Sequence, residues 1–350
     1  MPLGSGSAVA EQVVDGDQWV LVEKERIAAP LPHGGSVLVT RKRPLSGSIR
    51  GAVLLLHGFA CTRYAWHLSR RSFSAYLASR GYDVWNLELR GHGLSRAYGS
   101  RLPKRFEDYV NEDVPAVAKA LAEAGHRRFF LLGHSMGGAL AYAAAPDLGL
   151  RARGVVTLSG VFRWGGGALL IRAATPLLHA VERLHRAVGA GAGLPLYANL
   201  VGEVVALNLW AIEAGIVKIP AEGWAPHSIE QPVLREWLKR ALDRTSAAIL
   251  ATMGRWAWTG EFTDSESRCD YAARWARCGV PSLVIAGDRD RLADAEADVR
   301  PAFEAATGDR SFRMFGRCRD GVEFGHVDLV IGRAAPKLVW PTIGDWLDGH

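Results

Sequence analysis

The sequence predicts an α/β fold in which a mostly parallel central sheet is flanked by helices and interrupted by a helical insertion. From Ala52 onward, short apolar runs alternate with stretches of helical spacing, a rhythm that is typical of βαβ units. Over residues 163–263 the rhythm stops and no strand is evident. It returns at residues 282–286. We therefore expect the insertion to form a cap ahead of the last part of the sheet.

The composition fits one large domain with an insertion. The chain has 350 residues, of which 49% are hydrophobic, so a full core can form. We expect a flexible N-terminal segment over residues 1–16, an α/β core over residues 17–162 and 264–350, and a helical cap over residues 163–263.

The expected elements follow from periodicity and turn residues. Residues 19–22 and 36–40 predict a hairpin, with turn residues over 30–35. Apolar runs without alternation, such as residues 53–56, fit strands that are covered on both faces. Further strands are expected at residues 82–87, 129–132, 154–158, 282–286 and 311–315. Helices are expected at residues 65–80, 106–124, 136–145, 168–188, 197–216, 231–259, 293–306 and 336–347.

The charge pattern argues against a nucleic-acid-binding protein, and the cysteine content argues against a disulfide scaffold. The net charge is +6, but no basic stripe is interleaved with aromatic residues, as a nucleic-acid surface requires. We expect a solvated basic surface.

The four cysteines show no C-x-x-C spacing, so free thiols are expected, with a Cys269–Cys278 bridge as the alternative. The N-terminus lacks the features of a signal peptide, which predicts a cytoplasmic location and leaves secretion open.

The segment Gly133-His134-Ser135-Met136-Gly137 is a G-x-S-x-G motif between a predicted strand and a predicted helix. This context is the one that the motif requires of a nucleophilic serine. A sharp turn there strains the serine backbone, and glycines allow the strand and helix to approach closely. We predict Ser135 as the nucleophile.

A tetrahedral intermediate needs two donors for its oxyanion. The N–H of Met136, directly after the nucleophile, is the first candidate. The N–H of Phe59 is the second, because Gly58 permits a turn at the end of an earlier strand. His57 is expected to be structural.

An acid and then a histidine should follow such a serine in chain order. Asp288 and Asp290 both follow the strand at residues 282–286. We predict Asp290, three residues past Gly287, with Asp288 as the alternative. His326 precedes the terminal helix and is the predicted base. The remaining histidines after Ser135 are less suitable, because they lie in the cap or at the chain end: His179, His185, His227 and His350.

These landmarks together resemble the α/β-hydrolase superfamily from about Gly51 through Leu347. In chain order they are Leu56-His57-Gly58-Phe59, Arg90-Gly91-His92-Gly93, Gly133 to Gly137, Gly287 to Asp290, and Gly325-His326. Residues 81–85, 106–109 and 326–329 are similar to the acid-lipase branch. Asp270-Tyr271 is similar to that branch and to polyhydroxyalkanoate synthases.

The differences from these relatives favour an esterase or lipase over a polyester synthase, a dehalogenase or an epoxide hydrolase. Acid lipases usually carry Gly-Asn after the arginine, whereas Gly91-His92-Gly93 is commoner in esterases. Polyester synthases use a cysteine nucleophile, and dehalogenases and epoxide hydrolases of this fold use an aspartate, whereas this chain has Ser135. The resemblance implies an esterase- or lipase-like enzyme that cleaves carboxylic esters through a Ser-Asp-His triad and an acyl-enzyme. Arg90 and His92 are expected to shape their loop.

Other functions stay open at this point. The same triad serves acyltransferases and thioesterases, and also amidases and carbon–carbon bond hydrolases. A non-catalytic ligand-binding homologue is an alternative of another class. No zinc spacing, G-x-G-x-x-G or P-loop occurs, so neither a metal nor a cofactor is expected.

The cap is expected to form the substrate pocket. Seven of the twelve tryptophans lie within or just after it, and they either line an apolar pocket or build the cap's own core: Trp164, Trp210, Trp224, Trp237, Trp256, Trp258 and Trp275. Residues 196–216 are rich in Leu and Val and are candidates for a lid that contacts a lipid surface. Cys61 and Tyr64 are candidate pocket residues.

Overall fold

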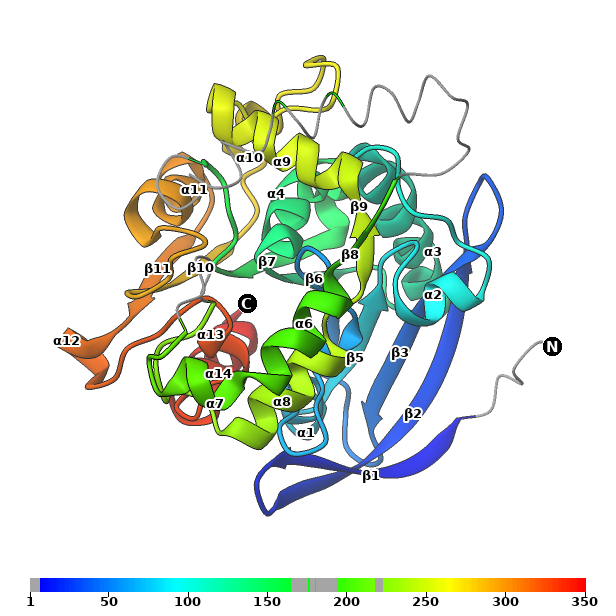
Figure 1. The fold of residues 1–350 in the computed structure, drawn as a ribbon. Helices are drawn as coiled ribbons and strands as arrows, with labels where there is room; N and C mark the ends of the chain where they lie inside the picture. Colours follow the sequence, from blue (N-terminus) through cyan, green and yellow to red (C-terminus); the bar gives the residue numbers. More distant parts are fainter. Residues whose placement is uncertain (1–6, 165–175, 177–179, 181–193, 218–222) are drawn as a thin grey trace.

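A nine-stranded sheet lies at the centre of the molecule (Figure 1). The computed structural model describes residues 7–164, 176, 180, 194–217 and 223–350. In these residues the strand order is β1-β2-β3-β5-β4-β6-β7-β10-β11. The strands are β1 (Ala8–Asp15), β2 (Gln18–Pro30), β3 (Ser36–Pro44), β4 (Gly51–Leu56), β5 (Tyr82–Glu88), β6 (Phe129–His134), β7 (Ala152–Leu158), β10 (Ser282–Gly287) and β11 (Arg310–Phe315). From β5 to β11 neighbouring strands are parallel, which confirms the predicted α/β fold.

The N-terminal strands extend this sheet in the antiparallel sense. β2 pairs with β3, and β3 with β5, so the expected hairpin is present and longer than predicted. The prediction of a flexible segment over residues 1–16 is wrong for residues 8–15. They form β1, which pairs with β2 from Ala8↔Lys24 to Asp15↔Gln18. Much of β1 is exposed, so its sequence carries little of the apolar alternation that marks a strand.

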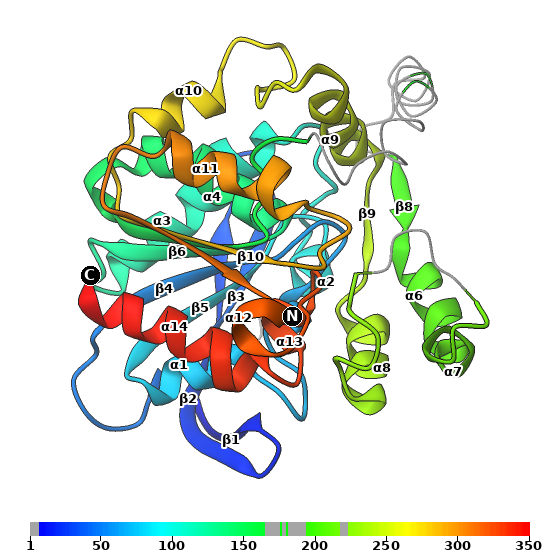
Figure 2. The same cartoon turned by 90° about the vertical axis from the view of Figure 1, so that its left-hand side faces the viewer.

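Helices cover both faces of the sheet (Figure 2). Alternate residues of β4 enter opposite cores: Leu54 and Leu56 pack on one side, whereas Val53 and Leu55 pack on the other. α1 (Phe73–Ser79) and α14 (Ala335–Gly349) cover the second side. The first side is covered by α3 (Val114–Glu123), α4 (Met136–Leu148), α10 (Tyr271–Ala276) and α11 (Arg300–Ala305).

Several predicted helices differ in extent. The helix expected over residues 65–80 begins only at Phe73, because Ser72 caps it by accepting the N–H of Ala75. The helix expected to end at Pro146 continues to Leu148, since a proline in the last turn removes only one hydrogen bond. Shorter helical turns are η1 (Arg63–Ala65), α2 (Gly93–Ala97), η2 (Tyr109–Asp113), η3 (Gly149–Arg151), η4 (Ala295–Val299), α12 (Arg317–Asp320) and α13 (Asp328–Ile331).

The insertion lies between β7 and β10 and is mainly helical where it is described. Its helices are α6 (Ala198–Leu207), α7 (Leu209–Glu213), α8 (Gln231–Arg240) and α9 (Ala247–Thr259). The helix predicted over residues 168–188 lies outside the described residues except for residues 176 and 180. The prediction of no strand is wrong, because β8 (Pro195–Tyr197) pairs with β9 (Arg244–Ser246). Three-residue strands are too short to show alternation. We keep the cap boundaries, 163–263, as a proposal.

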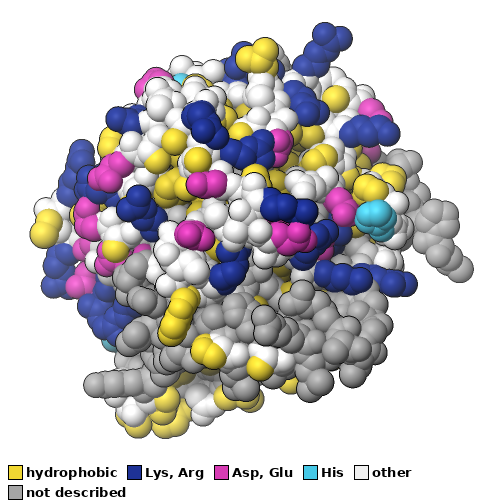
Figure 3. Space-filling model, turned by 90° about the horizontal axis from the view of Figure 1, so that it is seen from above, with side chains coloured by type: hydrophobic (Ala, Val, Ile, Leu, Met, Phe, Trp, Pro, Cys, Tyr) yellow, Lys and Arg dark blue, Asp and Glu magenta, His cyan; other side chains and the backbone are white. Residues whose placement is uncertain are grey.

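The surface mixes both signs of charge. Seen from above, basic and acidic side chains are interspersed over the described residues (Figure 3). Cys61, Cys269, Cys278 and Cys318 are all free, so the alternative of a Cys269–Cys278 bridge is wrong. None of the helices within the described ranges has the length and apolar character needed to cross a membrane.

Candidate active site

Ser135 stands at the sharp turn between β6 and α4. Its backbone angles are φ 57° and ψ −124°, a strained combination for a residue with a side chain. The turn is tight enough that a Cβ on Gly133 would lie 2.2 Å from the Gly137 carbonyl oxygen, and one on Gly137 would lie 2.1 Å from that of Leu56. Glycine is therefore required at both positions. This geometry presents the Ser135 side chain above the ends of the parallel strands.

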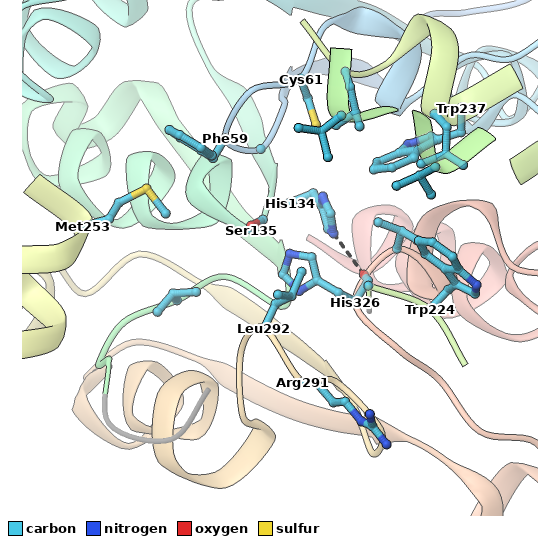
Figure 4. Close-up of a pocket in the computed structure, with 18 of the residues that line it drawn as sticks. Phe59, Cys61, His134, Ser135, Trp224, Trp237, Met253, Arg291, Leu292 and His326 are labelled. Atoms are coloured by element: carbon cyan, nitrogen blue, oxygen red, sulfur yellow. Dashed lines mark hydrogen bonds between the residues drawn. The ribbon is translucent and has the colours of Figure 1, made fainter. Parts of the chain in front are cut away.

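A cavity of about 370 Å³ lies over Ser135 (Figure 4). Loops of the core and segments of the insertion both contribute to its wall. The core supplies Gly58, Phe59, Cys61, His134, Ser135, Val161, Arg291, Leu292, His326 and Val327; the insertion supplies Trp164, Val201, Val205, Gly223, Trp224, Trp237, Leu238, Leu242 and Met253. Most of these side chains are apolar, so the cavity suits an apolar group.

The tryptophans of the predicted cap divide between pocket and core. Trp164, Trp224 and Trp237 line the cavity. Trp256 and Trp275 are buried in the hydrophobic core instead, and Trp210 and Trp258 are exposed. The expected pocket role therefore occurs for three tryptophans, whereas Trp256 and Trp275 pack in the core shared with the sheet and not in a separate core of the cap. Cys61 lines the cavity as expected, and burial raises the pKa of its thiol to about 12. The Tyr64 hydroxyl instead accepts hydrogen bonds from Arg63 and Arg240.

His326 and Asp290 meet beside Ser135. The Asp290 Oδ2 atom lies 2.7 Å from His326 Nδ1, and both side chains are buried. The Asp290 Oδ1 atom accepts the backbone N–H groups of Leu292 and Ala293, each at 2.9 Å. Burial opposes ionisation of Asp290, but His326, with a smaller contribution from the Ala293 N–H, outweighs it and holds the pKa of Asp290 below its usual value.

Asp288, the alternative acid, is engaged elsewhere. Its carboxylate accepts the N–H of Arg317 at 2.8 Å and that of Phe324 at 2.9 Å. It therefore connects the segments around Arg317 and Phe324, which both follow β11. Asp290 is the aspartate in contact with His326.

The candidate oxyanion donors approach the serine from two sides. A Cβ on Gly58 would lie 3.1 Å from the Ser135 Cβ, so the loop with Phe59 passes directly beside Ser135. Met136 begins α4. Among the described residues, neither the Phe59 nor the Met136 N–H donates to another protein group. Both are thus available to a bound oxyanion.

His57 has the surroundings of a structural residue. Its Nε2 accepts the Leu89 N–H at 3.1 Å, and its Nδ1 lies 2.9 Å from the Gly58 carbonyl. Burial, with a smaller effect of His92, lowers the pKa of His57 to about 3. The neutral ring thereby fixes the loop with Phe59 to the end of β5.

Arg90 and His92 shape their loop. Arg90 pairs with Asp113 and Glu112. The His92 Nδ1 faces the Arg90 carbonyl, and its Nε2 lies 3.2 Å from the Thr245 hydroxyl in β9. The loop therefore also connects the core to the insertion.

His134 is a site residue that sequence reasoning did not single out. Its Nε2 donates to the His326 carbonyl at 3.0 Å (Figure 4), and the two ring centroids lie 4.7 Å apart. Burial and the neighbouring His326 lower the pKa of His134 to about 3, so the ring stays neutral. Its position inside the G-x-S-x-G motif is the only sequence signal that pointed to it.

The other candidate histidines lie apart from this cavity. His227 pairs with Glu213, and His350 with Asp309. His179 and His185 lie outside the described residues. Within the described part of the chain, no cluster of three or more His, Cys, Asp or Glu side chains is arranged to hold a metal ion.

Comparison with known proteins places this geometry in a family. A family model described as "Serine aminopeptidase, S33" matches residues 47–319. The curated relatives include human Lipase member K, 31% identical over 124 residues, which are 33% of this chain and 30% of the relative. Epoxide hydrolase 3 of Xenopus tropicalis is 37% identical over 109 residues, 30% of this chain and 25% of that protein. The chain thus spans less than a third of the length of each of these relatives.

Solved structures share the fold over nearly the whole chain. A thermophilic esterase from Thermogutta terrifontis gives a TM-score of 0.60 at 17% identity, covering 93% of this chain and 98% of that one. A monoacylglycerol lipase from Paleococcus ferrophilus gives 0.56 at 19% identity, covering 89% and 99%. The resemblance to α/β hydrolases drawn from the sequence is confirmed.

Proposed function

We propose that this chain, which belongs to the Serine aminopeptidase S33 family of α/β hydrolases, cleaves carboxylic esters through Ser135, Asp290 and His326. One observation carries the proposal: a strained serine and a histidine that contacts a buried aspartate line one apolar cavity. The names of the relatives, which include lipases and esterases, support an ester as the substrate.

The first half-reaction acylates the serine. His326 accepts the Ser135 hydroxyl proton while Oγ attacks the ester carbonyl carbon, and a C–Oγ bond forms. The carbonyl electrons move to oxygen, where the N–H groups of Phe59 and Met136 stabilise the charge. Asp290 orients His326 and stabilises its positive form. When the intermediate collapses, the carbon–alkoxide bond breaks, and the alcohol leaves with the proton from His326.

Water completes the cycle. His326 takes a proton from water as its oxygen attacks the acyl-enzyme carbonyl, and the same two N–H groups hold the second oxyanion. Collapse breaks the C–Oγ bond, releases the carboxylic acid and returns the proton to Ser135.

The apolar wall favours a lipid-like ester. α6 and α7 lie at the edge of the molecule, with α8 between them and the core (Figure 2). On α6, the side chains of Leu200, Val204 and Leu207 are 59%, 60% and 66% exposed. Val201 is 63% exposed and also lines the cavity, so this apolar face is continuous with the pocket. Exposed patches of this kind mark contact surfaces, and we assign this one to aggregated lipid-like substrate.

Hydrolysis of p-nitrophenyl esters from acetate to palmitate tests the proposal. The parent protein should turn over these esters, and Ser135→Ala should lose activity by roughly 10⁴-fold or more. Ser282→Ala is the matched control, because this buried hydroxyl lies at the far end of β10 and has no partner among the described residues. A parent that binds these esters without turnover would contradict the proposal. Product analysis with added alcohol separates hydrolysis from acyl transfer.

A further inference from the structure

The loop that carries His326 is attached to the insertion through one buried carboxyl group, that of Asp328. Its Oδ2 accepts the N–H of Gly325 at 2.5 Å and the N–H of Ala225 at 2.8 Å. Gly325 directly precedes His326, whereas Ala225 belongs to the insertion. Asp328 is 1% exposed. A single carboxyl oxygen therefore joins two segments that lie a hundred residues apart.

The two segments also contact each other directly. The Val327 N–H donates to the Gly223 carbonyl at 2.8 Å. A Cβ on Gly325 would lie 2.8 Å from the Trp224 Cα and 2.9 Å from the Ala225 nitrogen. The backbone of residues 223–225 thus passes against the histidine loop with no room for a side chain between them. Trp224 and Val327 then form adjoining parts of the cavity wall.

We propose that Asp328 is a positioning residue for His326, and that it makes docking of the 223–228 segment and placement of the base a single event. This inference rests on the proposed function, since it assigns a task within the same site. Asp328 contacts neither Ser135 nor the cavity. It acts through the backbone on both sides of His326.

Proton counting shows which form of the carboxyl group fits this network. The Ser228 hydroxyl lies 2.7 Å from Asp328 Oδ1 and 2.6 Å from the Ala225 carbonyl oxygen. A serine hydroxyl has one proton and cannot donate fully to both oxygens. All contacts become hydrogen bonds if Oδ1 carries a proton and donates to Ser228, which in turn donates to Ala225. An asparagine at position 328, with its amide nitrogen at the Oδ1 position, reproduces this pattern.

The neutral pattern explains why an acidic side chain is tolerated in a buried position. If Asp328 is ionised, the single Ser228 proton serves only one of the two oxygens that the hydroxyl contacts, those of Asp328 and Ala225. A carboxylic acid or a carboxamide at position 328 satisfies every partner. The two variants Asp328→Asn and Asp328→Ala therefore separate the hydrogen-bond pattern from the charge.

The test combines ester hydrolysis with hydrogen exchange of peptides that cover residues 223–228 and 324–328. Asp328→Ala should raise exchange in both peptides together and lower kcat by about 10- to 100-fold with little change in KM, because two buried N–H donors lose their acceptor. Asp328→Asn should keep the protection and most of kcat. Ser228→Ala, a milder change, should shift both readouts in the same direction and keeps the test valid if Asp328→Ala does not fold.

A matched control separates positioning from general destabilisation. Asp83 is also fully buried and hydrogen-bonded, to Arg41 and His126, at the opposite end of the parallel strands. Asp83→Asn should lower stability without lowering kcat.

Three outcomes would overturn the inference: exchange that rises in only one of the two peptides, an unchanged kcat in Asp328→Ala, or an Asp328→Asn variant as impaired as Asp328→Ala. Exchange needs no turnover. An inactive parent protein would therefore refute the proposed ester hydrolysis, whereas unaltered exchange in Asp328→Ala refutes the role of Asp328 alone.

Discussion

The two sides of the cavity are held in place by different means. On the core side, Ser135 and Gly58 approach each other so closely that a Cβ at position 58 would lie only 3.1 Å from the Ser135 Cβ, and backbone N–H groups hold the Asp290 carboxylate. On the insertion side, α6 buries Gly202 and Ala206 and leaves most of its large apolar side chains exposed. The proposed reacting groups thus lie on close-packed backbone, whereas the surface proposed to meet the substrate's apolar part is only partly packed.

The insertion itself contains segments that are fixed to the core and a helix that is not. Residues 223–228 and β9 are tied to the core by buried hydrogen bonds: the Ala225 N–H donates to Asp328, and Thr245 contacts His92. Among the described residues, no such hydrogen bond joins α6 to the core. The α6 residue Glu203 instead pairs with Lys239 of α8, at 3.6 Å. Local stability follows buried contacts, so we expect α6 to open more readily than residues 223–228 and β9.

The largest expected effect tests the core side. Asp290→Asn should lower kcat by about 10⁴-fold, because the amide no longer stabilises the correct tautomer and charge of His326. Steady-state kinetics on a short ester measures this loss.

Asp288→Asn is the matched control for this change. Asp288 lies two residues away and braces loops instead of contacting His326, so its kcat should fall by less than about 10-fold. Equal losses in the two variants would show that the acid has been assigned wrongly.

The second-largest expected effect is a pH dependence of stability caused by Asp328, which joins the loop of His326 to the insertion. Burial raises the pKa of Asp328 to about 6, and the charge of Asp290 contributes. Between pH 4 and pH 6 the folded state therefore binds more protons than the unfolded state, so stability falls as the pH rises through this window. Asp328→Asn lacks this loss and should be more stable than the parent at pH 8 by up to about 3 kcal/mol.

Denaturant unfolding at pH 5 and pH 8 measures that difference for both proteins. The gap between them should shrink at the lower pH. A gap that is the same at both pH values would contradict the titration of Asp328 in this range.

The smallest effect tests the exposed face of α6. Replacing Leu200 and Val204 together by Ser should lower activity on emulsified long-chain esters by about 10-fold and leave monomeric short esters unaffected. Stability should change by less than about 0.5 kcal/mol per site, because both side chains are exposed. Leu150→Ser, at a leucine 90% exposed on η3, controls for loss of surface hydrophobicity. Equal loss on monomeric and emulsified esters would count against lipid contact.

The sequence predicted the core well because its signals are local. Buried strands such as β4 give continuous apolar runs, and the G-x-S-x-G motif is a short pattern in which Gly133 is required by a contact with Gly137, four residues away. Chain order indicated His326, and the spacing from Gly287 favoured Asp290 over Asp288; the structure brings Asp290 and His326 together, and we propose their catalytic roles.

The missed features depend on contacts between distant parts of the chain. The hydrogen bond from His134 to the His326 carbonyl spans 192 residues, and that from Ala225 to Asp328 spans 103. Neither leaves a periodic pattern or a motif. β1 was missed for a different reason, since an exposed edge strand has no buried face to mark it.

Labelling with a serine-reactive phosphonate tests the central claim most directly, because the product mimics the acyl-enzyme and is not hydrolysed. The account predicts one label per chain, located by peptide mapping on Ser135, with ester hydrolysis lost in proportion to labelling and no label on Ser135→Ala. A label on another residue, or ester hydrolysis that persists in fully labelled protein, would contradict the assignment of Ser135 as the nucleophile.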